Sequence, residues 1–219
     1  MRAMFLFVLA LALGFGTAFA KIEDRAKSKH DDALKLAKQA TAKMNEKAWD
    51  EAIALYTEAL DMNALEKKGA AQARYNRGIA YSNTNQCDKA IADFDAAVEV
   101  LTEESGIYMS RAVCKIKTQQ TEQGLADLNK AVELKPDEPQ YRRLRCLANY
   151  NLRKIAEALP DCDLALAAKP DDVVVLEAVG TGAETLGDFA RARAAYTKLA
   201  EVQPGNKVAQ DGLKRIQGK

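Results

Sequence analysis

Arginine and aspartate recur as pairs at a fixed spacing. Three arginines stand at equal intervals along the chain, and each is followed at one constant distance by an aspartate: Arg77 and Asp93, Arg111 and Asp127, Arg145 and Asp161. A carboxylate beside a cation can serve acid–base chemistry, and it can also form a purely structural ion pair. The equivalent positions before this series hold Gln39 and Leu55, and one interval after it they hold Val179 and Ala195. Because the two charges appear and disappear together, the pattern predicts structural pairs that hold neighbouring helices in register.

Cysteine is the second residue type that could do chemistry. The four cysteines, Cys87, Cys114, Cys146 and Cys162, form neither a C-x-x-C pair nor a zinc-ligand spacing, so thioredoxin-like and zinc sites are disfavoured. Each could be a small buried apolar residue. If bridges form, the first choice is Cys146 with Cys162, which lie at facing positions of two paired helices, and Cys87 with Cys114 follows by elimination.

The chain offers little else for catalysis. His30 is the single histidine, so neither a histidine triad nor a site with several histidine ligands can be built. Gly180-Thr181-Gly182 resembles a phosphate-binding loop only superficially, because it lies inside a predicted helix with no strand before it. We therefore predict a protein that is not an enzyme and that has no cofactor and no metal site.

The elements that carry these residues form a repeat. Residues 71–102 hold two amphipathic helical patterns separated by a polar break, with the small residues Gly78, Ala90 and Ala97 where the helices must touch. The pattern recurs at a constant period in the three units that follow and once before it, across a join four residues longer. This gives five units at about 33–66, 71–104, 105–138, 139–172 and 173–206 and leaves 207–219 as a closing helix. Such units bury their apolar faces against their neighbours, so residues 21–219 are predicted to form one stack.

Some segments depart from this regularity. We expect a charged helix over Lys21–Lys47, Trp49 in the turn that follows it, and a long loop over Asn63–Ala70. Pro160 falls in the first turns of the fourth unit's second helix. That helix is therefore predicted to start late or to kink.

The N-terminal segment, residues 1–20, differs from the rest. A short basic start, an apolar run over Ala3–Phe15 and the sequence Ala18-Phe19-Ala20 are typical of a cleaved signal peptide. The apolar run is at or below the ~18–20 residues that a membrane-spanning helix needs, although an uncleaved anchor stays an alternative. We expect an exported protein, either periplasmic or secreted.

Charge is balanced along the chain. Lys and Arg total 32 against 31 for Asp and Glu, and 48% of the residues are hydrophobic. The molecule has no overall basic field, so nucleic acid is not an expected partner.

The repeat resembles a known family. Small residues stand at the eighth, twentieth and twenty-seventh positions of the units, apart from Leu199 in the fifth. Large residues stand at the twenty-fourth position (Tyr56, Phe94, Leu128 and Tyr196), and prolines stand one period apart at Pro136, Pro170 and Pro204. Over about Ala33–Asn206 the pattern is similar to tetratricopeptide repeats. The resemblance implies an all-α fold, a right-handed α-solenoid of about five helix-turn-helix repeats with a short C-terminal capping helix.

In that family the first helix of each repeat lines a concave groove. The resemblance carries this role to Gln72, Tyr75, Asn76, Ile79, Asn83, Met109, Lys117, Arg143, Tyr150 and Asn151. With Lys117 and Arg143 near its centre, such a groove suits an extended or helical peptide that bears an acidic group. Alternatively, Ile79 and its equivalents only pack between neighbouring helices.

The resemblance also implies a class of function. We expect an exported, non-catalytic scaffold or assembly factor that binds a protein or peptide segment in the groove. The alternative is a membrane-tethered subunit of an envelope complex, with membrane contact only if residues 1–20 are retained. A redox-responsive protein is a third interpretation, which depends on the state of the cysteines.

Overall fold

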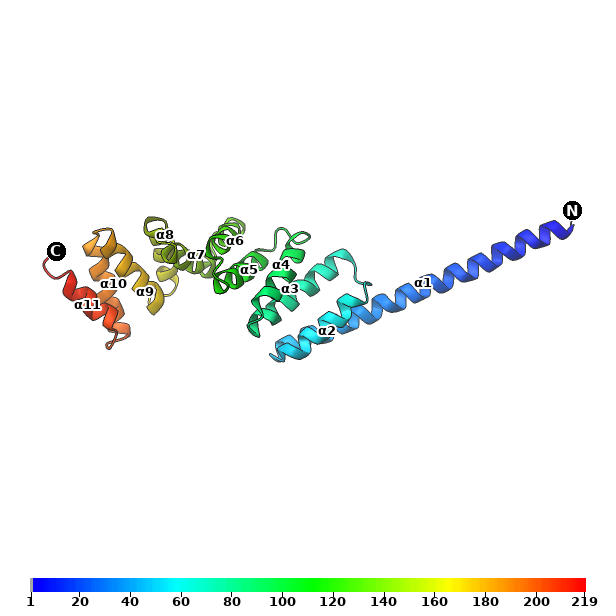
Figure 1. Ribbon diagram of the computed structural model, residues 1–219, viewed down its shortest axis with the longest axis horizontal. Coiled ribbons are helices and arrows are strands. Elements are labelled where there is room, and N and C mark those ends of the chain that lie inside the picture. The colour runs from blue at the N-terminus through cyan, green and yellow to red at the C-terminus, as the bar shows by residue number, and fades with distance from the viewer. Residues whose placement is uncertain (1) are drawn as a thin grey trace. The chain divides into compact units, whose positions relative to one another are not determined.

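The chain is built from α-helices alone wherever its structure is described. The computed structural model describes residues 2–219, and their side chains from residue 21 onwards, so the predicted signal segment lies outside the residues with described side chains. This part of the chain forms eleven helices and no strand, with the labels of Figure 1: α1 (Arg2–Asn45), α2 (Trp49–Asp61), α3 (Lys67–Asn83), α4 (Cys87–Val98), α5 (Ser105–Lys117), α6 (Thr121–Leu134), α7 (Pro139–Asn151), α8 (Ile155–Ala168), α9 (Val173–Thr185), α10 (Phe189–Val202) and α11 (Lys207–Arg215). The predicted all-α fold is confirmed.

Consecutive helices form antiparallel pairs. The helix α1 packs against α2, α3 against α4, α5 against α6, α7 against α8, and α9 against α10 (Figure 1). The helices α4, α6, α8 and α10 begin at Cys87, Thr121, Ile155 and Phe189, which are equally spaced along the sequence. This constant interval confirms the predicted helix-turn-helix repeat.

The chain divides into two compact units. The N-terminal unit (Met1–Leu101) holds α1 to α4, and the C-terminal unit (Thr102–Lys219) holds α5 to α11. Within the C-terminal unit the first helices of successive repeats also meet, since α7 contacts α9 and α9 contacts α11. Within residues 21–219 no helix combines the length and the apolar composition that crossing a membrane requires.

The eighth and twenty-fourth positions of a repeat face each other across each helix pair. In the second repeat a Cβ added to Gly78 would stand 2.6 Å from Cε1 of Phe94, and in the fifth a Cβ on Gly180 would stand 2.5 Å from Cε1 of Tyr196. Non-bonded carbon atoms do not approach so closely. Glycine at the eighth position is therefore what gives these two aromatic rings their space.

Other residue combinations fill the same gap elsewhere. In the third repeat Ala112 and Leu128 belong to one buried cluster, and in the fourth Cys146 is bonded to Cys162. As the residue at the twenty-fourth position shrinks from an aromatic ring to leucine and then to cysteine, its partner grows from glycine to alanine to cysteine. The first repeat, with Ala40 and Tyr56, does not follow this trend.

The turn inside each repeat uses a left-handed backbone residue at one fixed position. The φ angles are 59° at Lys47, 58° at Asn85, 64° at Gln119, 61° at Arg153 and 77° at Gly187. Just after these residues a backbone N–H returns to the carbonyl five residues earlier, as from Gln120 to Lys115 at 2.8 Å, which is the bonding of a Schellman helix end. The sequence pattern did not reveal these turns, because only the fifth repeat carries the glycine that usually marks them.

Two local predictions are wrong, and so is one of the two alternatives in a third. Trp49 is the first residue of α2 rather than a turn residue. The expected loop over Asn63–Ala70 is shorter, because its last four residues add a helical turn to the start of α3 at Lys67. The helix α8 starts at Ile155, one period after α6, and so does not start late; Pro160 lies inside it with its side chain exposed.

Candidate functional site

Each predicted arginine–aspartate pair is formed as a two-bond contact within one repeat. Arg77 donates from Nε and Nη2 to the two carboxylate oxygens of Asp93, both at 2.7 Å. Arg111 with Asp127 and Arg145 with Asp161 have the same arrangement. The three aspartates are 6%, 6% and 3% exposed. Their charges are thus neutralised in the protein interior, where they join the two helices of a repeat.

Two of these arginines also reach the preceding repeat. Arg77 donates from Nη1 to Thr57 Oγ1 at 3.0 Å, and Arg145 donates from Nη1 to Asn129 Oδ1 at 3.3 Å. Thr57 and Asn129 occupy the same position, the twenty-fifth, of their repeats. These contacts between repeats were not predicted. The polar residue that recurs at the twenty-fifth position is the sequence feature that could have indicated them.

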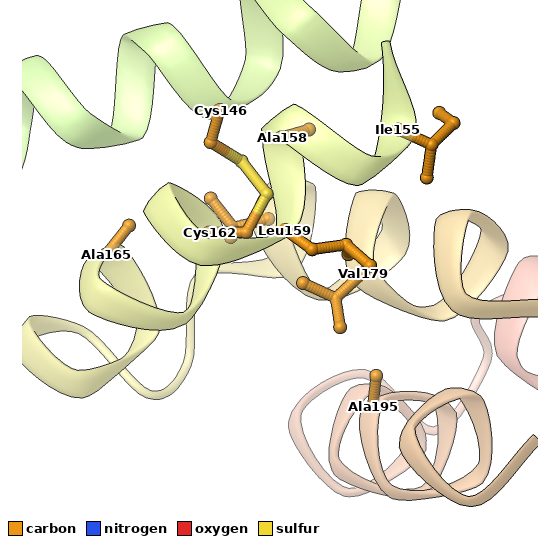
Figure 2. Packing of buried hydrophobic residues seen from close by; sticks show 9 residues of the cluster. Cys146, Ile155, Ala158, Leu159, Cys162, Ala165, Val179 and Ala195 are labelled. Atoms are coloured by element: carbon orange, nitrogen blue, oxygen red, sulfur yellow. A yellow bond between two sulfur atoms is a disulfide. The ribbon is translucent and has the colours of Figure 1, made fainter. Parts of the chain in front are cut away.

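The cysteines behave differently from one another. Cys146 and Cys162 form a disulfide with their Cα atoms 5.1 Å apart, inside a buried cluster that includes Ile155, Leu159 and Val179 (Figure 2). The predicted bridge between Cys87 and Cys114 is not formed, and both are buried thiols. Cys87 is the first residue of α4, so it does not share the facing eighth and twenty-fourth positions that bring the other two together.

The predicted groove residues of the N-terminal unit lie on α3, where several are used internally. Gln72 donates to Asn76 Oδ1 at 3.1 Å, and Asn76 in turn donates to the Tyr56 hydroxyl at 3.0 Å. Tyr75 and Ile79 are half-buried, and the Tyr75 ring lies 6.1 Å from that of Phe94. Gln72 and Asn83 keep exposed side chains. Most of the predicted groove residues on α3 therefore contact other residues of the N-terminal unit.

The cationic centre predicted for the groove is not available as expected. Arg143 donates from Nε to Asp172 Oδ2 at 2.6 Å. Asp172 also accepts from the Val175 backbone N–H at 3.2 Å and so caps α9. Burial alone would raise the pKa of Asp172, but these bonds from Arg143 and Val175 outweigh it and lower that pKa. Of the two predicted cations, only Lys117, exposed at the end of α5, stands outside such a pair.

The remaining predicted groove residues separate into packed and open positions. Met109 packs beside Tyr141 in a cluster between α5, α6 and α7. Tyr150 and Asn151, near the end of α7, instead line an open hollow of about 250 Å³. Its walls come from three successive first helices and comprise Leu147, Tyr150, Asn151, Val174, Glu177, Ala178, Thr181 and Val208.

One end of this hollow, which we call the α7–α9 hollow, is closed by a polar contact. The hydroxyls of Tyr150 and Thr181 lie 2.8 Å apart. Residue 182 is glycine, and a Cβ there would stand 2.9 Å from Cγ2 of Ile155, so this glycine lets α9 approach α8 closely. Leu147 and Tyr150 also pack on the buried cluster that holds the disulfide. The hollow thus has a rigid floor.

The charged wall of the hollow is Glu177. Its Oε1 accepts a hydrogen bond from Asn206 Nδ2 at 2.7 Å. Asn206 is itself fixed, because its Oδ1 accepts from the Ala209 backbone N–H at 3.1 Å and caps α11. The capping helix therefore holds the carboxylate at the edge of the hollow. Glu177 lies at a position where the family resemblance predicts a groove residue, whereas Val208 was not predicted, because it becomes a neighbour of Glu177 only when α11 packs on α9.

A second polar cluster fastens α11. Arg215 donates from Nε and Nη2 to Glu184 at 2.8 and 2.9 Å, and the Tyr196 hydroxyl donates to the same carboxylate at 2.7 Å. The bond from Arg215, helped by that from Tyr196, lowers the pKa of Glu184 to about 2 against the opposing effect of burial. Gly212 completes the contact, because a Cβ there would overlap the Tyr196 ring.

Comparisons with known proteins agree with this architecture. A family model described as tetratricopeptide repeat matches residues 38–105 and 115–173. The structure of YrrB, described as a tetratricopeptide repeat protein with an unusual peptide-binding site, superposes with a TM-score of 0.73 at 22% identity and covers 90% of this chain and 98% of its own. MamA from AMB-1 gives 0.70 at 18%, with 82% and 96% covered. No curated protein matches the sequence. The chain belongs to the tetratricopeptide repeat family.

Proposed function

We propose that this protein is an exported, non-catalytic interaction module that binds a segment of another protein in the α7–α9 hollow. The observation that carries the proposal is the hollow itself, which is formed by the first helices of successive repeats and lined by Leu147, Tyr150 and Asn151. Repeat proteins of this kind use the surface built by stacked units for binding. The resemblance to YrrB supports the fold.

Capture by a photo-crosslinking residue tests this proposal. Asn151 is exposed at the rim of the hollow, so a crosslinker there should trap a partner from the extracytoplasmic fraction. The matched control is Glu157, which is equally accessible but lies on α8 away from the hollow. Equal yields from the two positions, or none from Asn151, would contradict a partner site at the hollow.

Export is supported by the sequence of residues 1–20 and is tested separately. N-terminal sequencing of the protein recovered outside the cytoplasm should give a chain that starts near Lys21. A chain that still begins at Met1 would favour the membrane-tethered alternative.

A further inference from the structure

The α7–α9 hollow has an aliphatic lining. Four of its residues are Leu147, Val174, Ala178 and Val208. Val174 is 50% exposed, one of the few large apolar side chains with that much open surface among the described residues. A scattered exposed valine is ordinary, but one that stands in a concave aliphatic wall offers a place to bury a partner's side chain.

The size of the hollow limits what it can hold. Clefts for drug-sized ligands measure roughly 300–1,000 Å³. At about 250 Å³ this hollow is smaller, so it suits one anchoring side chain of a longer segment. The rest of such a segment would lie along the open face between α7 and α9.

The charge at the hollow is negative. Glu177 is the charged member of its lining, and only its Oε1 is used by Asn206. The nearest predicted cation on α7, Arg143, is neutralised by Asp172. A cation on the partner would therefore meet Glu177, whereas a carboxylate there would be repelled.

We propose that the α7–α9 hollow binds a basic-aliphatic segment, in which an aliphatic side chain enters the hollow and an adjacent lysine or arginine pairs with Glu177. This inference rests on the proposed function and names the chemistry of its partner. It replaces the acidic peptide that the sequence suggested, because that expectation depended on Arg143 being available.

Three blocked synthetic peptides that differ only at two adjacent positions test the inference with the full chain. One carries Leu–Lys, the second Leu–Glu and the third Ser–Lys. By isothermal titration calorimetry, the Leu–Lys peptide should bind about fivefold more tightly than Leu–Glu, the size expected for one partly exposed ion pair. It should bind about tenfold more tightly than Ser–Lys, because a buried leucine is lost.

A charge-removing variant identifies the residue responsible. Glu177→Gln should abolish the preference for Leu–Lys over Leu–Glu and keep the preference for leucine over serine. The matched control is Glu201→Gln, at an exposed glutamate of α10, which should keep both preferences.

Three results would overturn the inference. They are equal or tighter binding of Leu–Glu by the unmodified chain, an unchanged preference in Glu177→Gln, and a stable dimer in which a second copy covers Val174. If crosslinking from Asn151 still captured a partner in any of these cases, the proposed function would stand and only the partner chemistry would fail.

Discussion

Cys146 and Cys162 are joined at the facing positions that Gly180 and Tyr196 occupy one repeat later. The two helices of the fourth repeat are therefore held by a covalent bond at the point where the fifth repeat uses an aromatic ring. This substitution explains how a repeat without a large residue at its twenty-fourth position can remain closed. The disulfide should therefore contribute to the stability of the fourth repeat, and an alanine–leucine pair at the same positions should be able to replace it.

Reduction should destabilise the unmodified protein. Opening a short disulfide loop typically costs about 2–4 kcal/mol in the free energy of unfolding. The double variant Cys146→Ala with Cys162→Leu restores the pair that Ala112 and Leu128 form, so it should be insensitive to reductant. Urea unfolding with and without dithiothreitol measures the effect of reduction on the stability of the unmodified protein and of the double variant. An unchanged midpoint in the unmodified protein, after alkylation has proved reduction, would be inconsistent with a stabilising bond.

Gly78→Ala tests the space reserved for Phe94. Alanine is the better helix former by about 1 kcal/mol, but its Cβ would overlap the ring and overpacking costs about 1–3 kcal/mol. We expect a net loss of stability, and partial recovery when Phe94→Leu is added. Thermal unfolding of the two single variants and the double variant gives the coupling. Additive effects would show that the two positions do not interact.

Removing one partner of a buried ion pair should lower the free energy of unfolding more than replacing both partners with apolar residues. Asp93→Ala leaves the Arg77 guanidinium without its carboxylate, a change that typically costs about 3–5 kcal/mol. The double variant Arg77→Val with Asp93→Ala copies the apolar residues Val179 and Ala195 of the fifth repeat, so it should lose less. Chemical denaturation of both variants tests the order. A double variant at least as unstable as Asp93→Ala would contradict it.

Glu184 should make the packing of α11 on the rest of the C-terminal unit sensitive to pH. Its pKa falls from the ordinary 4.5 to about 2. A lowered carboxyl pKa gives stability that is complete above about pH 4.5 and is lost as the pH falls toward 2. The melting temperature of the unmodified chain should therefore exceed that of Glu184→Gln at neutral pH, and the gap should close on acidification. A gap independent of pH would exclude this role.

The repeat could be predicted from sequence because it depends on local spacing. The residues Gly78, Ala112 and Cys146 stand one period apart, and the facing positions follow from helix geometry. In the same way the arginine–aspartate pairs connect positions within one repeat. Here the sequence and the structure agree because each interaction repeats with the chain.

The hollow could not be predicted as fully, since its details depend on contacts between repeats. Arg143 was expected to face a ligand, but it pairs with Asp172, the residue that caps the first helix of the next repeat. Glu177 gains its position from Asn206 and α11. The two contacts join the same two repeat positions one period apart, but the residue types change from arginine and aspartate to glutamate and asparagine, so the spacing alone does not predict them.

The affinity of the Leu–Lys peptide for Val174→Asn tests the central claim most directly. Val174 is half exposed, so a neutral polar side chain there should leave the fold intact while removing an apolar side chain from the aliphatic wall. The matched control is Leu164→Asn, at a leucine of α8 that is 48% exposed and does not line the hollow. We predict that Val174→Asn weakens binding by about tenfold, equivalent to about 1.4 kcal/mol, and that Leu164→Asn does not. Unchanged affinity in Val174→Asn would contradict binding in the α7–α9 hollow.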